Sequence, residues 1–129
     1  MREASQRAWD LLTQLFEILR NEQDQGRLAQ QYMQISTSSV VSGPTPVEQA
    51  AMIASCRIER SHRGYGSLDL RDTLNKIAHH DTGLVSFRVD NRGAHYLILG
   101  GSFRGSRWIS EILVAKLCKN AAAAVKAIR

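Results

Sequence analysis

Residues 68–99, LDLRDTLNKIAHHDTGLVSFRVDNRGAHYLIL, join the pattern of a helix directly to the pattern of a β-hairpin. The helical half has apolar residues at three- and four-residue spacing: Leu70, Leu74, Ile77 and Ala78. Apolar residues then alternate with polar ones over 85–89, as in a half-buried strand. Turn residues at 90–93 and a second apolar run at 95–99 complete the hairpin. This stretch therefore predicts an α+β domain.

The segments before this stretch predict three helices and a loop. Residues 3–21 carry an apolar stripe typical of an amphipathic helix. Gly26 interrupts this pattern, and residues 28–35 continue it as a second helix or a kinked extension. The segment 36–45, STSSVVSGPT, is rich in serine, glycine and proline, which favours a connecting loop. An N-cap, a first-turn proline and a capping-box acid then predict a helix to about residue 59: Thr45, Pro46 and Glu48.

The segments after the hairpin predict one more strand and a final helix. Apolar residues alternate over 108–114, which favours a third strand, although a helix beginning at Ser106 competes with it. Residues 115–128 include four consecutive alanines and predict a helix. We therefore expect one domain over residues 1–129. Its fold class is α+β: a predominantly helical bundle of four to five helices, with a small antiparallel meander of two or three strands before the last helix.

The composition is that of an ordinary globular protein. Hydrophobic residues make up 43% and charged residues 22%, and the longest apolar runs are too short to span a bilayer. Residues 1–20 mix charges with apolar residues and lack the cleavage site of a signal peptide. We therefore expect a cytoplasmic protein with no membrane partner, and reduced core thiols at Cys56 and Cys118.

Basic residues are concentrated in the middle of the chain. The net charge is +5, and arginine outnumbers lysine between residues 57 and 107. A folded patch of this kind suits forked contacts to phosphate groups. The candidates for nucleic-acid contacts are Lys76, Arg88, Arg92, Arg104 and Arg107. The alternative is an ordinary solvated basic surface.

Three residues of the helix at 68–80 share one edge and form the candidate catalytic set. At 100° per residue, Arg71, Asn75 and His79 fan out over about 80° beside the apolar stripe. His79 suits a general acid or base, Asn75 can orient it or hold a phosphate oxygen, and Arg71 can stabilise negative charge. In the alternative interpretation, Asn75 and His79 bond neighbouring backbone groups and only stabilise packing.

Other motifs point to no metal or cofactor. The glycines at 100–105 lack the lysine of a P-loop, and no histidine or cysteine pair has zinc-ligand spacing. No serine stands in a nucleophile elbow. Trp108 and Tyr96 have rings that suit base stacking, although aromatic residues on an alternating strand are more often core.

The segment Leu74 to His79, LNKIAH, resembles the motif of the HEPN superfamily (higher eukaryotes and prokaryotes nucleotide-binding domain). That motif is an arginine, often followed by asparagine, and a histidine after four to six residues. Asn75 and His79 match by position, Leu74 stands where the family has arginine, and seven residues separate Arg71 from His79. Residues 68–118 are also similar to a loosely defined group of small uncharacterised bacterial proteins.

The HEPN resemblance implies a helical bundle, dimerisation that brings two motifs together, and roles in RNA cleavage, toxin–antitoxin pairs and phage defence. Because Leu74 replaces the arginine, we expect a catalytically degenerate domain that binds RNA or a nucleotide through a basic surface near His79. One alternative is an active metal-independent ribonuclease that uses His79 and Arg71. Another is a protein-interaction or antitoxin-like module that pairs through its first helix, with a protein partner or a second copy.

Overall fold

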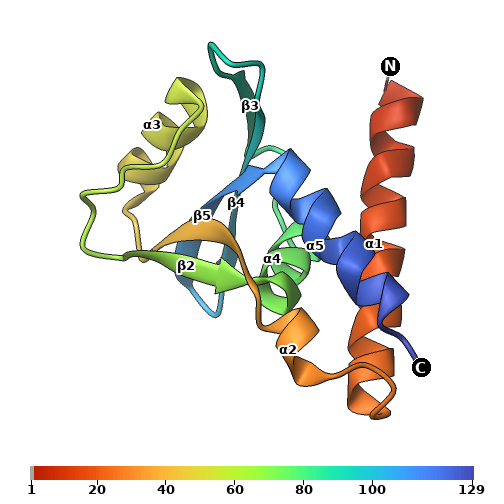
Figure 1. Ribbon diagram of the computed structural model, residues 1–129. Helices are drawn as coiled ribbons and strands as arrows, with labels where there is room; N and C mark the ends of the chain where they lie inside the picture. Colours follow the sequence, from red (N-terminus) through yellow and green to blue (C-terminus); the bar gives the residue numbers. More distant parts are fainter. Residues whose placement is uncertain (1) are drawn as a thin grey trace.

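An antiparallel five-stranded sheet forms the centre of the computed structural model, which describes residues 2–129 (Figure 1). The strands lie in the order β2-β1-β5-β4-β3, so β5 is central and β2 and β3 are the edges. Their bounds are Ser36–Ser42 (β1), Tyr65–Asp69 (β2), Val85–Val89 (β3), His95–Phe103 (β4) and Ser106–Leu113 (β5). Every neighbouring pair is antiparallel.

Helices cover the two faces of the sheet unequally. Their bounds are Arg2–Asp24 (α1), Gln30–Met33 (α2), Pro46–Ser55 (α3), Leu70–Ala78 (α4) and Val114–Lys126 (α5). Figure 1 shows α1, α4 and α5 on one side of the sheet and α3 on the other. We call these sides the four-helix face, which α2 also joins, and the α3 face. Within residues 2–129, no helix combines the length and the apolar character needed to cross a bilayer.

The sheet shows that the predicted fold class is wrong. The expected meander is present as β3, β4 and β5, but β1 and β2 extend it to five strands within the described residues, so the architecture is not predominantly a helical bundle. The segment 36–45, expected to be a loop, supplies β1. Residues 65–69, where the sequence predicts no strand and where the helix at 68–80 is expected to start, supply β2.

The serine-rich strand β1 is stable because its inward polar groups have partners. Ser38 Oγ lies 2.7 Å from Thr73 Oγ1, and Asn120 Nδ2 donates to Thr37 Oγ1 at 3.0 Å. Burial of such groups is tolerated when each finds a hydrogen bond. The partners come from α4 and α5, so the strand depends on contacts distant in sequence.

Several local predictions are confirmed. Strands at 85–89 and in 95–103 form the expected hairpin, and β5 and α5 lie where the alternation and the alanine run indicate. The capping box of α3 is complete, with Thr45 Oγ1 accepting from the Glu48 backbone N–H at 3.1 Å and the Thr45 N–H donating to Glu48 Oε1 at 2.8 Å. The helix ends at Ser55 instead of about residue 59, because Cys56 adopts a left-handed φ of 59°.

Two apolar clusters hold the layers together. The larger one fills the four-helix face with fully buried side chains of α1, α4 and the sheet, among them Leu19, Leu74 and Ile112. The smaller one joins α3 to the sheet: Val41, Met52, Ile58, Ile98 and Ile109. The cysteines are free thiols, but the expectation of core positions is wrong for Cys118, which is exposed on α5.

Candidate functional site

The predicted residues Asn75 and His79 line a groove at the margin of the four-helix face. The groove has a volume of about 520 Å³ and lies between α4 and the β4–β5 hairpin. We call it the α4 groove, and its lining is Asn75, Lys76, His79, Ser102, Phe103 and Trp108. The helix carries three polar side chains to it, and the hairpin carries two aromatic rings.

Lys76 is a partly buried cation of the α4 groove. Its Nζ lies 4.7 Å from the centre of the Trp108 ring, which is the geometry of a cation–π contact. Partial burial lowers the pKa of the Lys76 ammonium, and the nearby Asp72 carboxylate partly opposes this shift. The lysine is therefore incompletely solvated and has free donors to offer to an anion.

Gly101 allows the Trp108 ring to lie flat against the hairpin. The two residues are directly paired across β4 and β5, and a Cβ at position 101 would come within 2.6 Å of the Trp108 Cζ2 atom. The ring therefore occupies the space of a missing side chain. This close approach fixes the platform on which Lys76 rests.

Asn75 and His79 leave their polar groups free for a ligand. Neither side chain makes a hydrogen bond within the part of the chain that the structure describes, and the His79 imidazole is exposed at the end of α4. The backbone-bonded role applies instead to the next residue, His80. Its Nδ1 donates to the Ile77 carbonyl at 2.6 Å, and its ring packs 4.6 Å from that of Trp9.

An exposed aromatic ring borders the groove at the end of β4. The Phe103 side chain is 64% exposed, and the Arg104 guanidinium lies 5.1 Å from its ring centre. Arg104 has a φ of 52° and lies in the tight turn between β4 and β5. An apolar ring beside a guanidinium is a suitable stacking surface for a base.

Arg71 does not join the α4 groove. Its Nη1 donates to Gln23 Oε1 at 2.6 Å and to Asp24 Oδ1 at 3.2 Å, so the arginine ties α4 to the end of α1. The structure thus brings together two of the three residues of the candidate catalytic set and places the third in an interhelical contact. Negative charge in the groove would meet Lys76, which is one residue from Asn75, and not Arg71.

The five predicted basic residues do not form one surface. Lys76 and Arg104 belong to the α4 groove and its border. Arg88 pairs with Glu111 on the α3 face, and Arg107 Nη1 donates to Gln49 Oε1 at 3.2 Å. Arg92 lies in the exposed β3–β4 turn. The folded chain therefore distributes its positive charge over both faces of the sheet.

The sequence alone did not single out Phe103 and Ser102 as parts of a site. Both stand at the tip of a hairpin whose turn sequence, FRG, is visible, but only the packing of α4 beside that tip makes them part of a groove. Trp108 is 4% exposed, in agreement with a core position, yet one edge of it lines the groove. Trp108 is therefore a core residue whose ring also lines the groove, although the sequence presents a core position and a base-stacking position as alternatives.

The first helix keeps an exposed apolar stripe beside α5. Leu11 and Ile18 are 56% and 54% exposed, and Leu15 lines a shallow apolar hollow with Val125 and other α5 residues. This is the surface on which a protein partner or a second copy is expected from the sequence. Pairing through it stays a prediction.

Comparison of the chain with protein-family models, with curated proteins and with solved structures finds no match. The HEPN resemblance therefore stays a prediction, and the helical bundle that it implies is replaced by the five-stranded sheet.

Proposed function

We propose that the protein binds single-stranded RNA, or a nucleotide, in the α4 groove and does not cleave it. The observation that carries this proposal is the half-buried Lys76, held over the Trp108 ring beside Asn75 and His79, two side chains that make no hydrogen bond within the described residues. A cation, an amide and an imidazole in one groove offer donors for a phosphate and for a base edge.

The groove suits the two chemical parts of a nucleotide. Lys76 and His79 can hold a phosphate, and the flat surface of Phe103 with Arg104 can stack a base. Asn75 lines the same groove with an amide that both donates and accepts, as base edges require. Stacking and phosphate contacts of this kind favour single strands, because a duplex hides its base faces.

The position of Arg71 argues against cleavage. A metal-independent ribonuclease needs stabilisation of the charge that develops on the phosphate, and one missing donor costs about 3 kcal/mol. Arg71 is engaged by Gln23 and Asp24, and Leu74, at the position of the HEPN arginine, is fully buried in the core. Among the described residues, Lys76 is then the only lysine or arginine in the groove lining, and we infer that this single cation supports binding without turnover.

The test is titration of a labelled single-stranded RNA of about 15 nucleotides at several salt concentrations. Lys76→Met keeps an unbranched apolar stem near Trp108 but removes the charge, so it should weaken binding and reduce the slope of log K against log salt by about one. Phe103→Ala should cost about 1–3 kcal/mol of binding free energy if a base stacks there. Lys119→Met, which removes an exposed lysine on α5, is the matched control and should change little.

Two outcomes would contradict the proposal. One is an affinity that does not depend on salt or is unchanged in Lys76→Met. The other is cleavage of the RNA in EDTA by wild type that disappears in His79→Ala, which would establish the ribonuclease alternative. Titration with a mononucleotide in parallel distinguishes a site for free nucleotides from one that requires a chain.

A further inference from the structure

The α3 face is only half covered, and its uncovered half is polar. Helix α3 packs on Val41, Ile98 and Ile109. Beyond the end of α3, two adjoining hollows of about 340 and 330 Å³ open over the sheet, and both are lined by Arg60 and Glu111. We call them together the Glu111 groove. It lies on the opposite face of the sheet from the α4 groove, because Glu111 and Trp108 point to opposite sides of β5.

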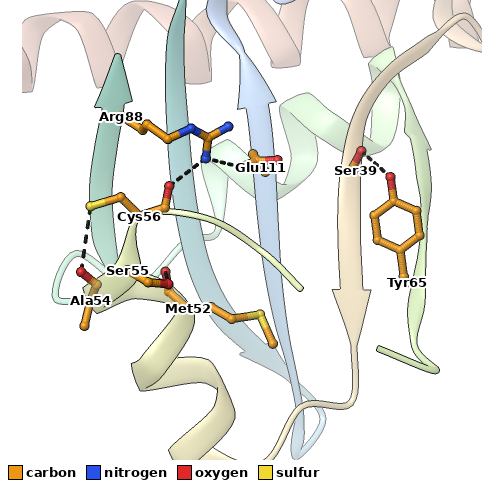
Figure 2. Close-up of polar contacts among 8 residues, drawn as sticks. All are labelled: Ser39, Met52, Ala54, Ser55, Cys56, Tyr65, Arg88 and Glu111. Carbon is orange, nitrogen blue, oxygen red and sulfur yellow. Dashed lines mark hydrogen bonds and ion pairs between the residues drawn. The ribbon is translucent and has the colours of Figure 1, made fainter. Parts of the chain in front are cut away.

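The floor of the Glu111 groove is an ion pair held in a fixed position. Figure 2 shows the Arg88 guanidinium reaching the Cys56 carbonyl and the Glu111 carboxylate with the same nitrogen, and the bond to Cys56 measures 2.7 Å. The guanidinium also lies 4.1 Å from the Tyr96 ring centre. The side chains of Arg88 and Glu111 are 18% and 5% exposed. Within residues 2–129, the other donors of Arg88 have no acceptor.

One end of the groove is cationic. Arg57 and Arg60 line the first hollow with Arg88, against the single carboxylate of Glu111. Neither Arg57 nor Arg60 makes a side-chain hydrogen bond or ion pair within the described residues. Three guanidinium groups around one carboxylate leave unbalanced positive charge, and forked donors match the oxygens of a phosphate group.

The other end of the groove is rich in hydroxyl groups. The second hollow is lined by Ser39, Tyr65, Ser67 and Tyr96, with the ammonium-bearing Lys116 also in its lining. Ser39 Oγ and Tyr65 Oη lie 3.2 Å apart. Figure 2 marks this hydrogen bond with a dashed line. Hydroxyls both donate and accept, and the Glu111 carboxylate, which lines both hollows, is a strong acceptor for ligand hydroxyls.

We propose that the Glu111 groove binds a phosphorylated sugar. The phosphate lies at the end formed by Arg57, Arg60 and Arg88, and the sugar hydroxyls face Glu111 and the serine and tyrosine hydroxyls. The volume of the two hollows falls within the range of small-molecule sites. A purely structural role would account for the ion pair of Arg88 and Glu111. It would not account for Arg57 and Arg60, which line the same end of the groove and make no ion pair within the described residues.

The experiment is isothermal titration calorimetry of the full chain with glucose 6-phosphate, glucose and inorganic phosphate. We expect glucose 6-phosphate to bind at least about tenfold more tightly than phosphate, and glucose alone to give no measurable binding. Arg60→Ala should weaken the binding of glucose 6-phosphate by about tenfold or more. Arg63→Ala removes another exposed arginine of the same loop, outside both hollows, and should leave binding unchanged.

Ser67→Ala tests the hydroxyl end, because it removes one hydroxyl of the second hollow without touching the arginines. This variant should bind glucose 6-phosphate more weakly than wild type does and should bind inorganic phosphate with unchanged affinity. Lys76→Met should not affect this binding, so failure here is distinguishable from failure of the RNA proposal, which concerns the α4 groove.

The proposal is overturned if no sugar phosphate binds, if Arg60→Ala binds glucose 6-phosphate as wild type does, or if phosphate and glucose 6-phosphate bind equally. Loss of glucose 6-phosphate binding in Lys76→Met would also overturn it, because the ligand would then lie in the α4 groove.

Discussion

The two faces of the sheet are built from the same five strands but differ in what covers them. On the four-helix face, α1, α2, α4 and α5 enclose one continuous apolar cluster. On the α3 face, one short helix covers a small cluster and leaves the rest of the surface to arginine, glutamate and hydroxyl side chains. We infer that most of the folding free energy comes from the first face, while the second keeps room for a ligand.

The central strand shows how this division arises. Along β5, Trp108 and Ile112 point into the large cluster, whereas Ile109 and Glu111 point to the α3 face. Ile109 meets α3, and Glu111 lies just beyond it. A charged residue in the middle of a central strand therefore marks the place where the helical cover ends.

The largest effect should come from removing core side chains on the two faces. Leu74 is fully buried in the four-helix cluster, so Leu74→Ala should lower the free energy of unfolding by about 4 kcal/mol. Met52 is 5% exposed in the smaller cluster and also lines an open surface hollow. Met52→Ala should therefore cost only about 2 kcal/mol, because the site can rearrange or admit water. Urea denaturation measures the free energy of unfolding of both variants. An equal loss in the two variants would show that the two apolar clusters contribute alike to stability.

Several elements of the fold can be predicted from the sequence because their signals are local. The stripe of α1, the alternation of β3 and the residues of the capping box all act within a few positions. The strand β1 cannot be predicted in this way. Its serines and threonine are typical of a loop. They fit a buried strand because Thr73 and Asn120, which are distant in sequence, form hydrogen bonds with the side chains of Ser38 and Thr37.

The candidate site is predictable only in part for the same reason. Helical spacing places Asn75 and His79 on one edge, and the structure keeps them together in the α4 groove. Spacing also adds Arg71, whose long side chain instead meets Gln23 and Asp24 of α1. The Arg71 side chain is long enough to reach either the α4 groove or the end of α1. Its direction depends on tertiary contacts, which the sequence of one helix does not reveal.

The next largest effect should come from the ion pair of the α3 face. Glu111→Ala removes the charged partner of the partly buried Arg88 and should cost about 3 kcal/mol of unfolding free energy. This loss of unfolding free energy is small for a broken buried ion pair because Arg88 keeps its hydrogen bond to the Cys56 carbonyl. Glu111→Gln keeps an acceptor of the same shape and should cost clearly less. Urea denaturation of both variants measures the difference.

Equal destabilisation by Glu111→Ala and Glu111→Gln would show that the carboxylate charge matters more than the hydrogen bond it accepts. Negligible destabilisation by both would show that the pair contributes nothing to folding, and the stability of the α3 face would then come from its apolar cluster.

The smallest effect should be a pH-dependent one at the start of α3, the only helix that covers the α3 face within the described residues. The backbone N–H of Thr45 holds the pKa of the Glu48 carboxyl below its usual value, with further help from the Thr45 hydroxyl and from His62. Because the pKa is lower in the folded state, this stabilisation is present above the unfolded-state value of about 4.3 and is lost as the pH falls through the folded-state value.

Wild type should therefore be more stable than Glu48→Gln near neutral pH, and the difference should shrink as the pH is lowered from about 5 through the folded-state pKa of Glu48, where its carboxyl becomes neutral like the amide. Thermal unfolding monitored by circular dichroism across this range measures it. Glu17→Gln is the matched control, since Glu17 is exposed on α1 and makes no hydrogen bond or ion pair within the described residues. No difference between the two proteins at any pH would mean that Glu48 stabilises α3 through the hydrogen bond that it accepts and not through its charge, because glutamine can accept the same bond from Thr45 at every pH.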